Sequence, residues 1–455
     1  MDGRWREQFR KVRRGELELQ SLLPAEVIGE ALAHAGYVER SSLYTAVTTV
    51  LTFLGQILRA DRSCQQAVNG LIAQRVAAAQ EVCSADTGGY CRARQRLPEV
   101  IFQRLQQQTG RDVEEQAPRE TLWCGRRVRV VDGSTLKIPE TAANCREYPL
   151  LTGQPEGGSY PLVRILVIFS LAVGTVLEAA LCPCQGKGTG ETGMLRGMAD
   201  SPLLRAGDVL LGDRYFAGYW DIAFWQARGL DTVTRLPKSR QVDFSRGVRL
   251  GRDDCLITWP KTDQPDWITS EEAASVPETL TLRAVRVRFT RPGFRTQRLI
   301  VLTTLLDPKA HPATELAELY RRRWQAELNL RSLKTHMGME LLRTKHPETV
   351  RKEFLMHLIA YNCVRRLAAI SAHTTHVPPW TISFKGALQT LNEFLPRLHH
   401  TPYEPWLHHL VYTTQQIRVD RRDRVEPYAT KQRPKEYPFL KEPRARYKTR
   451  IRARS

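Results

Sequence analysis

The order of apolar patterns between residues 126 and 236 constrains the fold of this chain more than any other feature. The run RRVRVVDGSTLKI is β-rich, and LVRILVIFSLAVGTVLEAAL holds two further β-rich runs separated by the turn signal Ala172-Val173-Gly174. The stretch AGDVLLGDRYFAGYWDIAFWQARGLDTVTRL then has the patterns of strand, turn, helix and strand. A strand and a hairpin followed by alternating strands and helices predict an α/β fold with a mixed sheet.

The regions on either side have different patterns. The runs PAEVIGEALAHAG and SSLYTAVTTVLTFLGQIL carry apolar residues at three- and four-residue spacing, which predicts helices near the N-terminus. These helices would either bind DNA or form a support or dimerisation layer. The expected organisation is a helical N-terminal domain at 1–110, an α/β domain in two parts at 111–236 and 298–400, a β-rich insertion between them at 237–297, and a basic tail at 401–455.

The charge of the chain indicates a polyanionic partner. Its 455 residues include 68 Lys and Arg against 48 Asp and Glu, a net charge of +20. Residues 416–455 alone hold 14 basic and 5 acidic residues. Nucleic acid is the first candidate for such a balance, and an anionic membrane surface is the second. No apolar run reaches the roughly 18 residues needed to span a bilayer, and no apolar signal segment follows the N-terminus.

The nine cysteines are an odd number without framework spacing, which favours reduced thiols in a cytosolic protein. The pair Cys182 and Cys184 has no second CxxC or histidine pair nearby, so a zinc site is not expected there.

The insertion contains one basic strand pattern. Val285, Val287 and Phe289 alternate with Arg286 and Arg288, so a strand would place the arginines on one face. A basic sheet face suits a DNA backbone. Exposed strands can also be basic for solubility alone, but DNA contact is the favoured interpretation.

The stretch YRRRWQAELNLRSLK surrounds a single glutamate with cations on a predicted helix. At about 100° per residue, Tyr320, Arg323, Glu327 and Lys334 fall on one face. Leu319, Leu330 and Leu333 form an adjoining flank that can dock on a sheet. Cations near Glu327 would keep it ionised, as a metal ligand requires. A salt-bridged surface helix is the alternative interpretation of this pattern.

Two aspartates upstream favour the metal-ligand interpretation over the surface-helix interpretation. Asp132 follows VRVV and precedes Gly133, and Asp213 follows VLLG, so both are expected where a strand ends and a loop begins. Ligands in α/β sheets usually bind at such strand ends. Each aspartate could also be a turn former or helix cap. Three carboxylates in a basic protein suit phosphoryl transfer with two Mg²⁺ ions, which prefer oxygen ligands.

These residues resemble those of a known family. The spacing Y-x2-R-x3-E-x6-K is intact from Tyr320 to Lys334, and the boxes DGST at Asp132 and GDRYF around Asp213 resemble its two aspartate boxes. This is the pattern of DDE transposases of the insertion sequence 4 family. The resemblance implies a ribonuclease-H-like catalytic domain with a β-rich insertion. It implies as metal ligands Asp132, Asp213 and Glu327, with two Mg²⁺ or Mn²⁺ ions, and as DNA phosphate-binding residues Tyr320, Arg323 and Lys334.

The resemblance also implies partners and a reaction. The family cuts double-stranded DNA at transposon ends and joins the freed 3′-hydroxyl to target DNA, and a homodimer in a synaptic complex is expected. A bacterial cytoplasmic, nucleoid-associated location is expected too, with no membrane partner. The alternatives are a metal-dependent nuclease that does not join DNA ends, and a non-catalytic DNA-binding derivative. The intact Asp132, Asp213 and Glu327 count against the last of these.

One departure concerns a hairpin intermediate at the transposon end. Close relatives receive a flipped base on a tryptophan in the strand before the glutamate helix, where this chain has QRLIVLTTL without an aromatic residue. Trp259, Trp267 or Phe294 could substitute, and the sequence does not select among them. Trp324, beside Arg323, could stack on an end base or belong to the core. The hairpin step therefore stays open.

Overall fold

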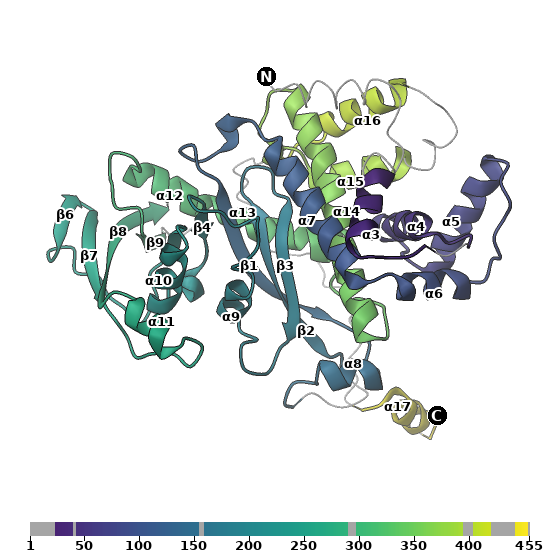
Figure 1. The fold of residues 1–455 in the computed structure, drawn as a ribbon, viewed down its shortest axis with the longest axis horizontal. Helices are drawn as coiled ribbons and strands as arrows, with labels where there is room; N and C mark the ends of the chain where they lie inside the picture. The colour runs from purple at the N-terminus through teal and green to yellow at the C-terminus, as the bar shows by residue number, and fades with distance from the viewer. Residues whose placement is uncertain are drawn as a thin grey trace.

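The structure is a computed structural model that describes residues 23–39, 42–153, 159–289, 297–394, 404–419 and 442–453. A nine-stranded sheet runs through the molecule in the order β3-β2-β1-β4-β5-β9-β8-β7-β6. Figure 1 shows β6, β7 and β8 at one end of the molecule and the helices α3 to α6 at the other. The mixed α/β fold predicted from the sequence is confirmed.

The N-terminal region is helical, as expected, over the residues that the structure describes. Thr45 and Ser63 begin two of its helices by accepting hydrogen bonds from the backbone N–H of Thr48 and Gln66. The last helix, α7, packs against both α14 and β3 and so ties this region to the sheet. The basic segment 1–22 lies outside the described residues. The helices are α3 (Ala25–His34), α4 (Ala46–Leu58), α5 (Cys64–Ala77), α6 (Gly88–Arg96) and α7 (Glu99–Glu115).

The first five strands form the half of the sheet that carries the predicted aspartates. The predicted hairpin is present, and its turn contains Gly174 at φ +75°, a conformation that favours glycine. Strand β1 pairs antiparallel with β2 and parallel with β4. The elements are β1 (Val128–Lys137), α8 (Ala142–Glu147), β2 (Leu162–Ser170), β3 (Val176–Pro183), α9 (Glu191–Arg196), β4 (Val209–Leu211), η2 (Arg214–Phe216), α10 (Tyr219–Ala227) and β5 (Asp231–Arg235).

The insertion continues the same sheet. Strand β9 (Gln297–Thr303) pairs with β5 on one side and β8 on the other, so the ladder passes from the first strands into the insertion without a break. The predicted alternation in β8 is confirmed, since Val285 and Val287 are buried while Arg286 and Arg288 are exposed. Phe294 lies outside the described residues. The other elements are β6 (Val248–Gly251), β7 (Asp254–Pro260), α11 (Ser270–Ser275) and β8 (Thr279–Phe289).

The C-terminal region is helical, and α15 and α16 pack against α14, whose central part is almost wholly buried. The range 401–455 was predicted to be a basic tail, but its first part is the helix α16, which packs on α14 and α15. Leu410 and Val411 of α16 are buried, and apolar burial of this kind attaches the helix to the folded body. These helices are α12 (Ala313–Arg322), α13 (Trp324–Arg331), η3 (Ser332–His336), α14 (Pro347–Thr374), α15 (Phe384–Phe394), α16 (Glu404–Gln416) and α17 (Arg444–Arg452).

Two further findings bear on the cellular context. Among the described residues, no helix has both the length and the apolar character required to cross a membrane. All nine cysteines lie in the described ranges as free thiols. The Cys182 sulfur contacts the Met194 sulfur at 3.3 Å.

Candidate active site

The pairing of β1 with β4 sets the relative positions of the two aspartates. In the parallel ladder of β1 and β4, Val128 pairs with Val209 and Val130 with Leu211. Continuing this register by two residues brings Asp132 level with Asp213. Neighbouring strands lie about 4.8 Å apart, so the two carboxylates are expected to lie close together.

The positions of the two aspartates differ from the prediction in one respect. Asp213 follows the end of β4, as expected, and its side chain accepts a hydrogen bond from the Tyr215 N–H at 2.7 Å. Asp132 lies in the interior of β1, not at its end. The strand continues to Lys137 because β2 still pairs with it where β4 has stopped. Asp132 is therefore held on a rigid strand, while Asp213 is held by a helical cap.

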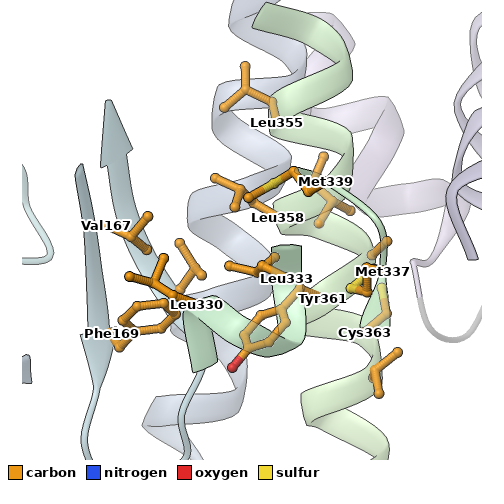
Figure 2. Packing of buried hydrophobic residues seen from close by; sticks show 14 of the residues in the cluster. Val167, Phe169, Leu330, Leu333, Met337, Met339, Leu355, Leu358, Tyr361 and Cys363 are labelled. Atoms are coloured by element: carbon orange, nitrogen blue, oxygen red, sulfur yellow. The ribbon is translucent and has the colours of Figure 1, made fainter. Parts of the chain in front are cut away.

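Glu327 lies on α13, which docks on the sheet through its apolar flank. The predicted docking leucines are all buried, and Figure 2 shows Leu330 beside Val167 and Phe169 of β2. The Glu327 side chain is 36% exposed and accepts a hydrogen bond from the Arg323 guanidinium at 2.6 Å. The docking leucines are Leu319, Leu330 and Leu333.

The predicted helix through this stretch is not continuous. Helix α12 ends and α13 begins at Arg323, where the Ala326 N–H bonds to the Arg323 carbonyl three residues back. Beyond α13, the chain widens into the π-helical turn η3, which carries Lys334. The single-face prediction assumed one regular helix at 100° per residue, and each irregularity rotates the side chains that follow it.

Lys334 nevertheless reaches the same site. Its Nζ donates a hydrogen bond at 3.0 Å to the Ser134 hydroxyl, two residues beyond Asp132 on β1. Successive side chains alternate across a strand, so Ser134 and Asp132 share a face. The structure thus brings Lys334 to the aspartate from a helical turn 200 residues away in the sequence.

Tyr320 and Trp324 have contrasting environments. Tyr320 is buried, which raises the pKa of its phenol; Arg323 and Arg235 oppose this rise, while Asp213 adds to it. The phenol thus lies among the charges of the site. The Trp324 side chain is 58% exposed, which excludes the core role considered for it.

Two of the other aromatic candidates, Trp259 and Trp267, lie against arginine side chains. Trp259 is buried beneath the Arg240 guanidinium, and Trp267 contacts the Arg196 guanidinium at 3.7 Å.

Burial and nearby carboxylates disfavour the ionised form of Asp132. Burial raises the pKa of Asp132 to about 6; Glu327 and Glu191 add to the rise, while Arg323 and the Gly133 N–H oppose it. A group whose carboxylate form is disfavoured in this way is often part of a functional site.

Glu191 is a fourth carboxylate that the sequence analysis missed. It begins α9, and a β-carbon placed on Gly133 would come within 2.3 Å of its carboxylate oxygen. Burial raises the pKa of Glu191, and the charge of Asp213 raises it further. A side chain at position 133 would displace the Glu191 carboxylate from this contact. A glycine in a strand interior often marks such a close approach, and this signal could have identified the contact.

The donor chemistry of the site fits a divalent cation. Asp132, Asp213 and Glu327 offer hard oxygen ligands, and the charge of Glu191 adds to the rise in the pKa of Asp132. Within the described ranges, no three Asp, Glu, His or Cys side chains are drawn together tightly enough to form a ready-made metal cage. Glu327 is paired with Arg323 instead.

Comparison with known proteins agrees with this geometry. Residues 123–363, more than half of the chain, match the transposase DDE domain family. The chain is also 25% identical over 433 residues to transposase InsG for insertion sequence element IS4 of Escherichia coli (strain K12), covering 92% of this chain and 93% of that protein.

The matched range includes Asp132, Asp213 and Glu327, and the ribonuclease-H-like fold predicted from the sequence is confirmed. The chain therefore belongs to the DDE transposases of the insertion sequence 4 family, metal-dependent enzymes that cut and transfer DNA strands.

Proposed function

We propose that this transposase binds the inverted repeats at the ends of its transposon, cuts the DNA there and joins the freed 3′-hydroxyl ends to target DNA. The observation that carries the proposal is the parallel pairing of β1 with β4, whose register, continued by two residues, brings Asp132 level with Asp213, together with the charge of Glu327, which raises the pKa of Asp132. Two transposon ends require two active sites, one for each end. The working form is therefore a homodimer in a synaptic complex.

Asp132, Asp213 and Glu327 would hold two Mg²⁺ or Mn²⁺ ions. Two such ions, when bound about 4 Å apart, activate the attacking oxygen and stabilise the leaving oxygen of a phosphoryl transfer. The rigid strand under Asp132 and the cap that fixes Asp213 support this assignment, since ligands held in place need little rearrangement.

Arg323, Lys334 and Tyr320 would hold DNA phosphates beside the carboxylates. The guanidinium of Arg323 has five N–H donors, so it can serve both Glu327 and a phosphate. Lys334 is anchored by Ser134, which directs its charge toward the face of the sheet that carries Asp132. Cations in these positions would also reduce the repulsion between the carboxylates and the DNA backbone.

Trp324 is the residue we assign to base stacking at the transposon end. Its exposed indole lies one residue after Arg323, so a base displaced from the duplex could stack on it while Arg323 holds the adjoining phosphate. A hairpin intermediate would need such a platform. The buried Trp259 is less suited to this role.

Strand cleavage and joining can be tested in one reaction. The full-length protein is incubated with Mg²⁺ or Mn²⁺ and a labelled duplex that carries the inverted repeats flanking its coding sequence, together with target plasmid. Cleaved and joined products are expected from the wild type and from the control Glu318→Gln, which alters the neighbouring exposed pair with Arg321. Neither product is expected from Asp132→Asn, Asp213→Asn or Glu327→Gln.

The outcomes separate the alternatives. Cleavage that persists in all three variants would overturn the site assignment. Cleavage without joining in the wild type would favour a nuclease of the same fold. Binding of the repeats without cleavage under either metal would favour a non-catalytic derivative.

A further inference from the structure

A pair of cysteines in the N-terminal helices has the features of a reactive dithiol. Cys64 is the first residue of α5, and Cys91 lies on α6. Their sulfur atoms are 3.8 Å apart, within the distance at which one thiol can donate to the other. Both side chains are half-buried, so small reagents can reach them.

Arg94 supplies the positive charge of this cluster. Its Nη2 lies 3.4 Å from the Cys64 sulfur and 3.9 Å from the Cys91 sulfur. The guanidinium also lies 4.8 Å above the ring of Phe53 and 4.8 Å above that of Tyr90, which shield it from water. Its Nε is buried, and among the described residues it has no hydrogen-bond partner.

No carboxylate satisfies this guanidinium in the described parts of the chain. Its remaining hydrogen bond goes to the side-chain carbonyl of Gln56 at 3.3 Å, and that oxygen also accepts from the Tyr90 hydroxyl at 2.7 Å. A half-buried cation with neutral oxygen partners is stabilised by a nearby anion. A thiolate is the anion that the cluster can supply.

We propose that Cys64 and Cys91 form a peroxide-sensitive dithiol, in which Cys91 is the thiolate that is oxidised first and Cys64 is the thiol that resolves it. The Cys91 thiolate attacks one oxygen of hydrogen peroxide, the O–O bond breaks, and sulfenic acid and hydroxide form. The Cys64 sulfur then attacks the Cys91 sulfur and expels its oxygen. With the proton of the Cys64 thiol and one from solvent, two thiols and one peroxide give one disulfide and two waters.

The electrostatics of the pair agree with these roles. The hydrogen bond between the two thiols lowers the pKa of Cys91 to about 6, with a further contribution from Arg94. The same hydrogen bond, together with burial, raises the pKa of Cys64, while Arg94 opposes this rise. The other titratable groups around the cluster are Tyr44, Tyr90 and Glu353, and burial raises the pKa of each.

The disulfide would join α5 to α6 and close the loop between them. Cross-links of this kind act mainly by restricting the unfolded chain, so the oxidised helices should open less often. The modification is independent of the metal site and of the reaction proposed above.

Two measurements on the full-length protein test the proposal. The first is the pH dependence of iodoacetamide labelling, read by peptide mass spectrometry. Cys91 is expected to label with a midpoint near pH 6. Cys124 is the internal control because it is more exposed, yet burial and Glu315 raise the pKa of its thiol. Arg94→Gln should move the Cys91 midpoint upward by about one unit or more.

The second measurement follows products after treatment with equimolar hydrogen peroxide. The wild type should give a Cys64–Cys91 linked peptide that dithiothreitol reverses. Cys64→Ser should instead accumulate sulfenic acid on Cys91, trapped with dimedone, and Cys91→Ser should give neither product. Circular dichroism confirms that the variants are folded. A Cys91 midpoint at or above pH 8, or oxidation of folded wild type without the linked peptide, would overturn the proposal.

Discussion

The charged clusters at the two ends of the β1–β4 ladder differ in burial and in how their charges are paired. Near the start of the ladder, Arg129 is 1% exposed and donates hydrogen bonds to Glu114 and to Asp208, the latter at 2.8 Å. Three residues further along β1, Asp132 faces other carboxylates in a half-exposed site where Arg323 bonds directly to Glu327. The first cluster is buried and bonded within itself, whereas the second is more open, and its carboxylates raise the pKa of Asp132 and Glu191.

This difference separates a structural cluster from a functional one. Buried ion pairs that satisfy each other hold elements together, and removing one member exposes the others to a large desolvation penalty. Carboxylates that repel each other lower the stability of the fold and persist where a cation or a substrate uses them. Replacing Arg129 should therefore damage the fold, and replacing the aspartates should damage the activity.

Asp213→Asn gives the largest expected effect. The amide oxygen of asparagine can still accept the Tyr215 N–H, so the cap and the fold should remain. Losing one metal ligand should reduce the rate of strand cleavage by roughly 10³-fold or more, because metal binding at the reacting phosphate is worth several kcal/mol. Cleavage rates and thermal unfolding are measured together. If the variant unfolds more readily but cleaves at the wild-type rate, Asp213 is a structural residue and not a metal ligand.

Arg129→Met gives the largest expected effect on stability. Methionine fills similar space but leaves Glu114 and Asp208 buried without their partner, which should lower the free energy of unfolding by about 3–5 kcal/mol. Denaturant unfolding measures this loss. Arg321→Met is the matched control, since its exposed pair with Glu318 should contribute no more than about 1 kcal/mol. Equal losses of unfolding free energy in the two variants would show that the buried cluster at Arg129 is no more stabilising than an exposed ion pair.

Asp132→Asn should stabilise the metal-free protein. The pKa of Asp132 rises from 3.8 to about 6 on folding, so its carboxyl favours the folded state fully below pH 3.8, and this contribution is lost as the pH rises through 6. Asparagine does not titrate. The variant should therefore match the wild type near pH 4 and exceed it by ~1–3 kcal/mol above pH 6. Unfolding with chelator present checks this, and a constant difference across the range would contradict it.

Glu191→Gln should have the smallest effect. Glutamine keeps the packing against Gly133 and removes the charge that acts on Asp213. The Mg²⁺ concentration required for half-maximal cleavage should rise about tenfold, in the range seen when residues supporting metal ligands are changed. Glu340→Gln, on an exposed residue near Lys137, is the control. An unchanged Mg²⁺ requirement would limit Glu191 to a packing role.

The structural features that could be predicted from the sequence depend on local residue patterns. The hairpin before Val176, the exposed arginines of β8 and the buried flank of Leu330 follow from periodicity and turn residues. The spacing from Tyr320 to Lys334 was sufficient to find the family.

The features that the sequence did not show depend on pairing between distant segments. The strand continues beyond Asp132 because β2 pairs with it, and Glu191 meets Gly133 because α9 packs back on the sheet. The boundary between α12 and α13 at Arg323 contains no glycine or proline, so no helix-breaking residue predicts it. The extent of the folded body past residue 401 likewise depends on contacts of α16 with α14.

The passage of the sheet from β5 through β9 into β8 has a mechanical consequence. Seven residue pairs join β9 to β8, but only Val301, Leu302 and Thr303 pair with β5. Bending of the insertion relative to the first strands should therefore concentrate in that short ladder. Arg235 ends it on the β5 side, and its charge acts on the Tyr320 phenol. If DNA bends the insertion, the Arg235 guanidinium would therefore move relative to the Tyr320 phenol beside the candidate active site.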